Sequence, residues 1–141
     1  MLRGRSPGFG FAVGAALGVV LILVACGGSR ELTGRWVATS ENAEGTSFVF
    51  GDDGTVLWLL PDTFHLRYET DPGASPRTLD LSGFDRGPLQ GYVLYCIYEF
   101  PEDERLRLDC EPGVPGERGS RIRPKTFGAV QTQTFVRRRR G

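Results

Sequence analysis

The chain has 141 residues, of which 40% are hydrophobic and 24% charged, and its formal net charge is zero. Residues 26–141 suffice for one small domain that buries its own core, and they are too few for two domains. The charge is unevenly divided. Residues 31–117 carry all 17 acidic groups and six arginines, a net charge of −11, whereas residues 118–141 carry seven arginines, Lys125 and no acid, a net charge of +8. The two parts attract each other in the fold or bind different partners.

The chain begins with the features of an export signal. Arg3 and Arg5 precede a run without charge over 9–25. A positive start, an apolar middle and a small-residue exit are typical of a secretory signal peptide. An uncleaved membrane helix is the alternative, because seventeen apolar residues reach the lower limit for crossing hydrocarbon. Three glycines at four-residue spacing would give such a helix a close-packing face.

The run ends in Leu23-Val24-Ala25-Cys26, which resembles the lipobox of bacterial lipoproteins. The resemblance implies cleavage after Ala25 and a diacylglyceryl group on the thiol of Cys26. Acyl chains of this kind anchor a protein stably when more than one is present. We therefore predict a lipoprotein signal-peptide helix over 1–25 and a lipidated Cys26 with a tether over 26–31. The expected location is outside the cytoplasm, lipid-anchored to the cell membrane or to the outer membrane.

Beyond the tether, short β-rich segments alternate with Gly, Pro and Asp, and no helix of useful length is indicated. Residues 64–70 alternate apolar and polar side chains, which places His65 on the outer face. Residues 55–60 are continuously apolar apart from Thr55, which predicts a strand covered on both faces. The predicted strands are 36–40, 46–50, 55–60, 64–70, 77–81, 92–100, 105–110 and 129–137. Their even spacing favours a barrel or a sandwich of about eight strands.

The strands on either side of 102–104 can be tested for pairing. With a three-residue loop over 102–104, Tyr98 faces Leu108. On the other face Glu99 lies opposite Arg107, so apolar side chains fall together and the charged pair has opposite signs. A shift of one residue would mix the two faces. The pattern therefore predicts a hairpin in this register.

The same register places Cys96 opposite Cys110. Disulfides persist in exported proteins. We predict a Cys96–Cys110 disulfide, with two free buried thiols as the alternative.

Six segments in order resemble a family of small lipocalin-like domains found in bacterial exported proteins. They are Leu32-Thr33-Gly34-Arg35-Trp36, Tyr68-Glu69-Thr70-Asp71-Pro72, Pro76-Arg77-Thr78-Leu79-Asp80-Leu81, Ile97-Tyr98-Glu99, Leu106-Arg107-Leu108-Asp109-Cys110 and Arg123-Pro124-Lys125-Thr126-Phe127. The resemblance implies a mainly β fold, a single small antiparallel up-and-down barrel over 32–137, followed by a basic tail over 138–141. It assigns no biochemical activity.

Gly34-Arg35-Trp36 also resembles the Gly-x-Trp signature of lipocalins. In those proteins the tryptophan closes the barrel floor, and an arginine of the last strand packs over it. Arg137 is the nearest candidate for that arginine, through stacking of a guanidinium on an aromatic ring. The implied role of Gly34, Trp36 and Arg137 is structural.

No catalytic constellation is visible. His65 is the only histidine, so a histidine-based metal site or triad cannot be assembled. Phosphate-binding glycine loops, Cys-x-x-Cys and Gly-x-Ser-x-Gly are missing from the sequence. We expect no enzyme, no metal and no cofactor.

Two features are candidates for carrying a function. Aromatic side chains could line an apolar pocket or simply fill a narrow barrel; the candidates are Phe48, Phe50, Trp58, Tyr68, Tyr92 and Tyr98. Residues 137–140 are four consecutive arginines, which would face anionic headgroups near a membrane or form a solvated end. The predicted partners are a membrane through Cys26 and a small hydrophobic ligand or an envelope protein. Export argues against nucleic acid.

The first expected function is a lipid-anchored envelope lipoprotein whose barrel holds a small apolar ligand. The alternative is an interaction or structural module without enzymatic activity. In that case the acidic body and the basic C-terminal tail dock another envelope component.

Overall fold

The computed structural model describes residues 4, 8 and 31–139. The predicted signal-peptide helix, Cys26 and most of the tether lie outside these residues. The strands are β1 (Gly34–Ala38), β2 (Ser47–Phe50), β3 (Thr55–Leu60), β4 (Asp62–Asp71), β5 (Arg77–Ser82), β6 (Val93–Glu99), β7 (Arg105–Gly113) and β8 (Gln133–Arg138). A short 3₁₀ helix, η1 (Glu41–Ala43), and one turn of α-helix, α1 (Glu117–Ser120), complete the described part.

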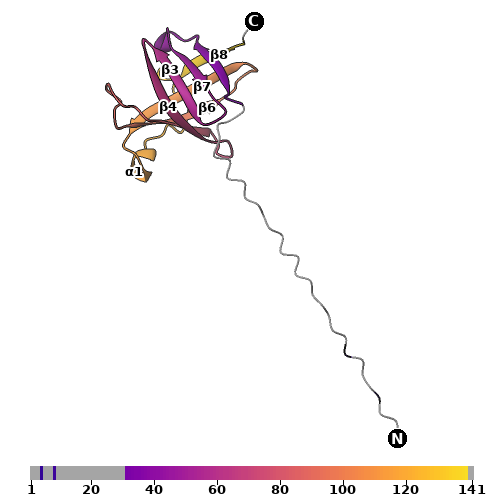
Figure 1. Cartoon of the computed structure of the whole chain (residues 1–141). Coiled ribbons are helices and arrows are strands. Elements are labelled where there is room, and N and C mark those ends of the chain that lie inside the picture. The colour runs from indigo at the N-terminus through magenta and orange to yellow at the C-terminus, as the bar shows by residue number, and fades with distance from the viewer. Residues whose placement is uncertain (1–3, 5–7, 9–30, 140–141) are drawn as a thin grey trace.

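The eight strands form one closed antiparallel barrel in chain order, which confirms the predicted fold class (Figure 1). Each strand pairs with the next, and β8 returns to pair with β1. All of these pairings lie within 34–138, so the barrel contains every strand partner that it needs. A closed sheet with its own core meets the requirements for folding as an independent unit. Among the described residues no helix is long and apolar enough to cross a membrane.

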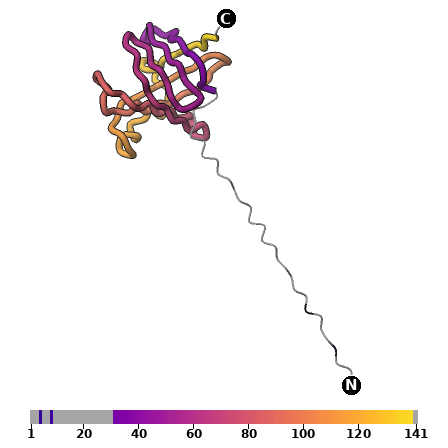
Figure 2. The backbone as a smooth tube through the Cα atoms, in the orientation of Figure 1, coloured from indigo at the N-terminus to yellow at the C-terminus, as the bar shows by residue number. Residues whose placement is uncertain are grey.

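The turns between the strands divide the barrel into two ends. Gly34 at the start of β1, the turn over 100–104 and the last residues of β8 lie together at one end, because Arg35 pairs with Arg138 and the backbone of Arg137 donates to Glu104. We call this the tether end. The smooth trace in Figure 2 shows α1 on the other side of the barrel from the last described residues of β8.

The predicted hairpin register is confirmed. β6 and β7 pair Tyr98 with Leu108 and Glu99 with Arg107, and Arg107 makes a 2.6 Å ion pair with Glu99 across the strands. β3 has the bounds predicted for it, and elsewhere the strand ends differ from the prediction by up to four residues. β8 begins at Gln133 and not at residue 129, and it includes Arg138, the first residue of the predicted tail.

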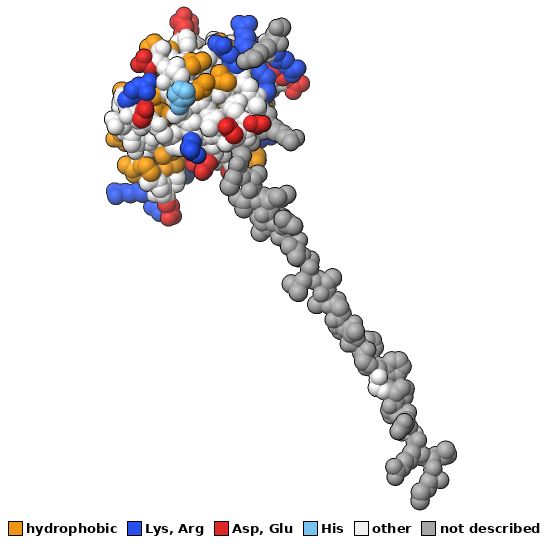
Figure 3. Space-filling view, in the orientation of Figure 1, with side chains coloured by type: hydrophobic (Ala, Val, Ile, Leu, Met, Phe, Trp, Pro, Cys, Tyr) orange, Lys and Arg blue, Asp and Glu red, His pale blue; other side chains and the backbone are white. Residues whose placement is uncertain are grey.

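The prediction that 55–60 is covered on both faces is wrong. Val56 faces inward with 1% of its surface exposed, whereas Leu57 and Leu59 are only half-buried on the outer face and Leu60 is 37% exposed. An antiparallel barrel covers one face of each strand by default, and nothing in the sequence of a strand shows whether a second layer lies outside it. His65 lies opposite Leu57 and is exposed, as expected; it is the pale blue side chain of Figure 3.

A second layer does lie outside β6 and β7. Tyr95, Ile97 and Asp109 point outward by strand alternation, yet their exposed fractions are only 4%, 1% and 2%. The segment over 114–132 covers them. The hydroxyl of Tyr95 accepts from the backbone N–H of Gly116 at 3.1 Å, and Asp109 accepts from the N–H of Gly128 at 2.8 Å.

The interior is filled by side chains. The aromatic ring of Phe48 lies 5.3–5.7 Å, centroid to centroid, from those of Phe50, Trp58 and Phe135, and Phe50 meets Tyr68 edge-on at 4.9 Å. Eight-stranded barrels have an interior just wide enough for side chains of this size to fill. The buried hydrophobic cluster comprises Leu32, Trp36, Ala43, Phe48, Phe50, Val56, Leu66, Tyr68, Leu79, Leu81, Phe84, Leu94, Cys96, Tyr98, Leu106, Leu108 and Phe135.

A filled interior makes a quantitative prediction for Phe48→Ala. Truncating a buried phenylalanine in a packed core costs about 3–5 kcal/mol of unfolding free energy. The matched control is Leu60→Ala on β3, which we expect to cost less than about 1 kcal/mol because Leu60 is partly solvated. Urea denaturation of both variants measures the difference. A Phe48→Ala cost as small as that of the control would indicate an open calyx.

Candidate functional site

The tether end is closed by the residues that the Gly-x-Trp resemblance singled out. Trp36 on β1 is fully buried and lies opposite Arg137 on β8. The guanidinium carbon of Arg137 lies 4.5 Å from the centre of the Trp36 ring, within the range of a cation–π contact. The indole N–H of Trp36 donates to the carbonyl of Leu32 at 2.8 Å. The ring is therefore held by a contact on its face and a hydrogen bond at its edge.

Arg137 also fixes the chain as it enters the barrel. Its guanidinium donates to the carbonyl of Thr33 at 2.7 Å and to that of Glu31 at 2.5 Å. Gly34 has a φ of +124°, a conformation that glycine adopts readily and other residues rarely do. The chain turns there from residues 31–33 into β1. One side chain of the last strand thus secures residues 31–33 to the barrel.

Glu104 links the turn over 100–104 to β8. Its carboxylate accepts from two nitrogens of Arg139, at 2.8 and 3.2 Å, and lies 3.5 Å from Nε of Arg137. The hydrogen bonds from Arg139 lower the pKa of Glu104 and raise that of Arg139. The backbone of Glu104 has a positive φ of 62°, the conformation expected at the last position of a three-residue hairpin loop. The acidic and basic parts of the chain attract each other here.

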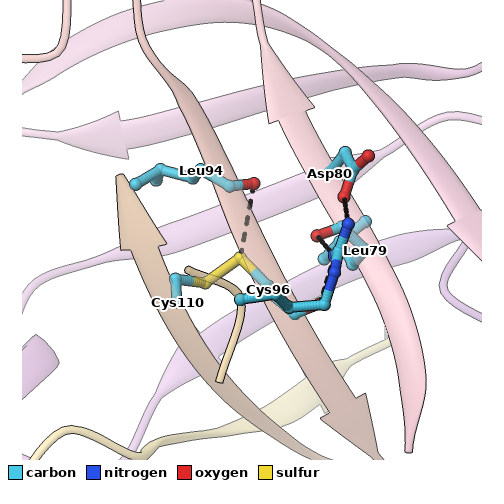
Figure 4. The surroundings of a disulfide bond; sticks show 6 residues. Leu79, Asp80, Leu94, Cys96 and Cys110 are labelled. Carbon is cyan, nitrogen blue, oxygen red and sulfur yellow. Dashed lines mark hydrogen bonds and ion pairs between the residues drawn. A yellow bond between two sulfur atoms is a disulfide. The ribbon is translucent and has the colours of Figure 1, made fainter. Parts of the chain in front are cut away.

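The predicted disulfide is present. Cys96 on β6 and Cys110 on β7 are directly opposite and bonded, 14 residues apart in sequence (Figure 4). The sulfur of Cys96 contacts the carbonyl of Leu94 at 3.8 Å. Behind the bond, Arg123 donates to the carbonyl of Cys96 at 2.8 Å and makes a 2.5 Å ion pair with Asp80. Arg123 therefore clamps the outer segment to β5 and β6 next to the cross-link.

The predicted aromatic lining divides into two groups. Phe48, Phe50, Tyr68 and Tyr98 are buried inside the barrel with exposed fractions of 0–4%, and Trp58 is half-buried beside them. Burial raises the pKa of the Tyr98 hydroxyl. The remaining candidate, Tyr92, precedes β6 and is 44% exposed, so it lies on the surface and not in the interior.

Hollows large enough for a ligand occur at the surface. Four cavities have volumes of about 400–920 Å³. Tyr98 lines one of about 400 Å³ at the tether end, beside Glu31 and Phe100, and the central rings of Phe48 and Phe50 line none of the four. In the range 31–139 the structure holds no group of three or more His, Cys, Asp and Glu side chains placed to bind a metal. The predicted lipidation site Cys26 lies outside the described residues. The contacts of Arg137 and Glu104 at the tether end are suited to closing the barrel and holding residues 31–33 against it.

The cross-link predicts a stability difference. In the chain-entropy description a loop of about 15 residues contributes roughly 3 kcal/mol. We expect Cys96→Ala with Cys110→Ala to lower the unfolding free energy by about this amount, with a small added loss because Cys96 is in the core. Denaturation with and without a reducing agent measures it. Reduction should destabilise the wild type and leave the double variant unchanged; a wild type indifferent to reduction would contradict the assignment.

Comparison of the chain with protein-family models, with curated proteins and with solved structures finds no match. Its function is therefore inferred from the residues and contacts described above.

Proposed function

We propose that the chain is an exported bacterial lipoprotein, anchored through Cys26, whose barrel is a rigid docking body for another component of the cell envelope. The binding surface is the outside of the barrel, and no catalytic step is part of the proposal. This places the interaction module ahead of the carrier of a small apolar ligand.

Two observations support export and anchoring. Leu23-Val24-Ala25-Cys26 has the residue types of a lipobox after an uncharged apolar run. The body of the protein carries a disulfide between β6 and β7. Bonds of this kind persist in oxidising compartments and are rare in the cytosol.

The packed interior favours a docking function over that of a carrier for a small apolar ligand. A carrier of an apolar molecule needs a cavity of a few hundred Å³ lined by apolar groups. In this barrel Phe48, Phe50 and Phe135 occupy the central space themselves and lie within 6 Å of one another or of further rings. A ligand would have to displace these side chains and forfeit their packing, which costs several kcal/mol per buried ring. The outer surface, by contrast, offers charged groups and open hollows.

Intact mass spectrometry of the protein extracted from bacterial membranes tests the anchoring. We expect a mass that corresponds to residues 26–141 with diacylglyceryl added at Cys26 and two hydrogens lost to the disulfide. A Cys26→Ala variant should retain residues 1–25 and gain no lipid. Full-length, unacylated wild-type protein recovered from the soluble cell interior would refute the proposal.

A further inference from the structure

Two arginines face each other on the ladder that closes the barrel. Arg35 on β1 lies directly opposite Arg138 on β8, and both side chains are exposed. Like charges directly opposite on a sheet repel each other, since their Cβ atoms are about 4.5–5.5 Å apart. The ion pairs of residues 31–139 include neither of them. The neighbours Arg137 and Arg139 are different, because both meet Glu104.

The pair borders the largest of the four surface cavities, a groove of about 920 Å³ that we call the arginine groove. Its lining residues are Gly34, Arg35, Val37, Val49, Arg137, Arg138 and Arg139. They include four arginines and no acidic residue, and the two valines supply an apolar floor. Basic side chains gather at this side of the molecule, beside the end of β8 (Figure 3). A ligand that suits such a groove is anionic at one end and apolar next to it.

The chain enters the barrel beside the groove. The carbonyl of Glu31 is bound by Arg137, which is adjacent to Arg138 in β8. Glu31 lies five positions after Cys26, a span of at most about 18 Å when fully extended. A lipid on Cys26 would therefore keep the groove near the headgroups. Arginines close to an anionic leaflet are attracted within about one Debye length, roughly 8–10 Å at moderate salt.

We propose that the arginine groove binds the phosphate of an anionic phospholipid in the leaflet that holds Cys26. The headgroup phosphate lies between Arg35 and Arg138, relieves their repulsion and turns the β1–β8 side of the barrel toward the membrane. The inference rests on the proposed anchoring and adds an orientation to it. The opposite side of the barrel, with α1, then faces away from the membrane and remains free for a protein partner.

The test supplies the tether chemically, so that its outcome does not depend on whether a cell acylates Cys26. Protein comprising residues 26–141, with Cys96 and Cys110 oxidised, is coupled through Cys26 to a maleimide lipid in vesicles. Vesicles of phosphatidylcholine are compared with vesicles containing phosphatidylglycerol. Phenylglyoxal then modifies exposed arginines, and peptide mass spectrometry gives a rate for each one. Arg118 in α1 and Arg121 just after it are internal controls, because both are exposed and neither lines the arginine groove.

We expect Arg35 and Arg138 to react about fivefold more slowly on phosphatidylglycerol than on phosphatidylcholine, the factor that corresponds to the attraction of one arginine near an anionic surface. Arg118 and Arg121 should react equally on both. Salt at 1 M, where the Debye length is about 3 Å, should remove the protection. Equal rates for Arg35 and Arg138 on both vesicles would overturn the proposal and leave the groove to a protein partner. Equal protection of all four arginines would also overturn it, since that indicates unspecific adsorption.

A paired variant separates binding from a structural role. Arg139 also lines the groove, so in the wild type it should react more slowly on phosphatidylglycerol than on phosphatidylcholine. Arg35→Gln with Arg138→Gln should abolish this difference. In solution without lipid the same variant should unfold at the same or a higher denaturant concentration than the wild type, because a like-charge pair has been removed. A destabilised variant would show that the two arginines support the barrel instead, and would contradict the assignment.

Discussion

The barrel depends on the contact between its first and last strands. Without β8 beside β1, the sheet would present two unpaired edges, which are sites of aggregation in β proteins. Arg137 makes this closure specific, because its guanidinium covers the buried ring of Trp36 and binds the carbonyls of Thr33 and Glu31. The same side chain therefore joins the end of the domain, the floor of its core and the beginning of the tether. A change at this position would affect all three.

Closure and packing together explain why function is assigned to the outside. The aromatic side chains of the core fill the barrel interior, the disulfide joins β6 to β7, and Arg123 holds the outer segment against β5 and β6. These contacts favour a body that keeps its shape when anchored by a short tether. Such a body can present one side to a membrane and another to a partner, with the charge of each side set by surface residues alone.

Short-range patterns in the sequence predicted much of this. The hairpin register followed from pairing apolar with apolar and Glu99 with Arg107, and the register in turn placed the two cysteines opposite each other. What depends on distant segments was not predictable in the same way. The sequence pattern placed Tyr92 at the start of a predicted strand, and only the fold shows that it precedes β6 and lies on the surface. Arg123 was missed as a clamp because its partners on β5 and β6 come from segments more than 25 residues away.

The Arg35–Arg138 pair was within reach of the sequence, because once Arg137 is set against Trp36, antiparallel pairing places the next residue of β8 opposite the preceding residue of β1. The central claim, a filled barrel that binds through its outer surface, is tested most directly by titrating the folded domain with N-phenyl-1-naphthylamine, an uncharged apolar dye that the arginine groove does not attract by charge, while following the emission of Trp36 and Trp58. The account predicts emission that does not change with added dye, since both indoles lie among packed side chains. Saturable one-to-one binding with a shift of tryptophan emission would contradict it.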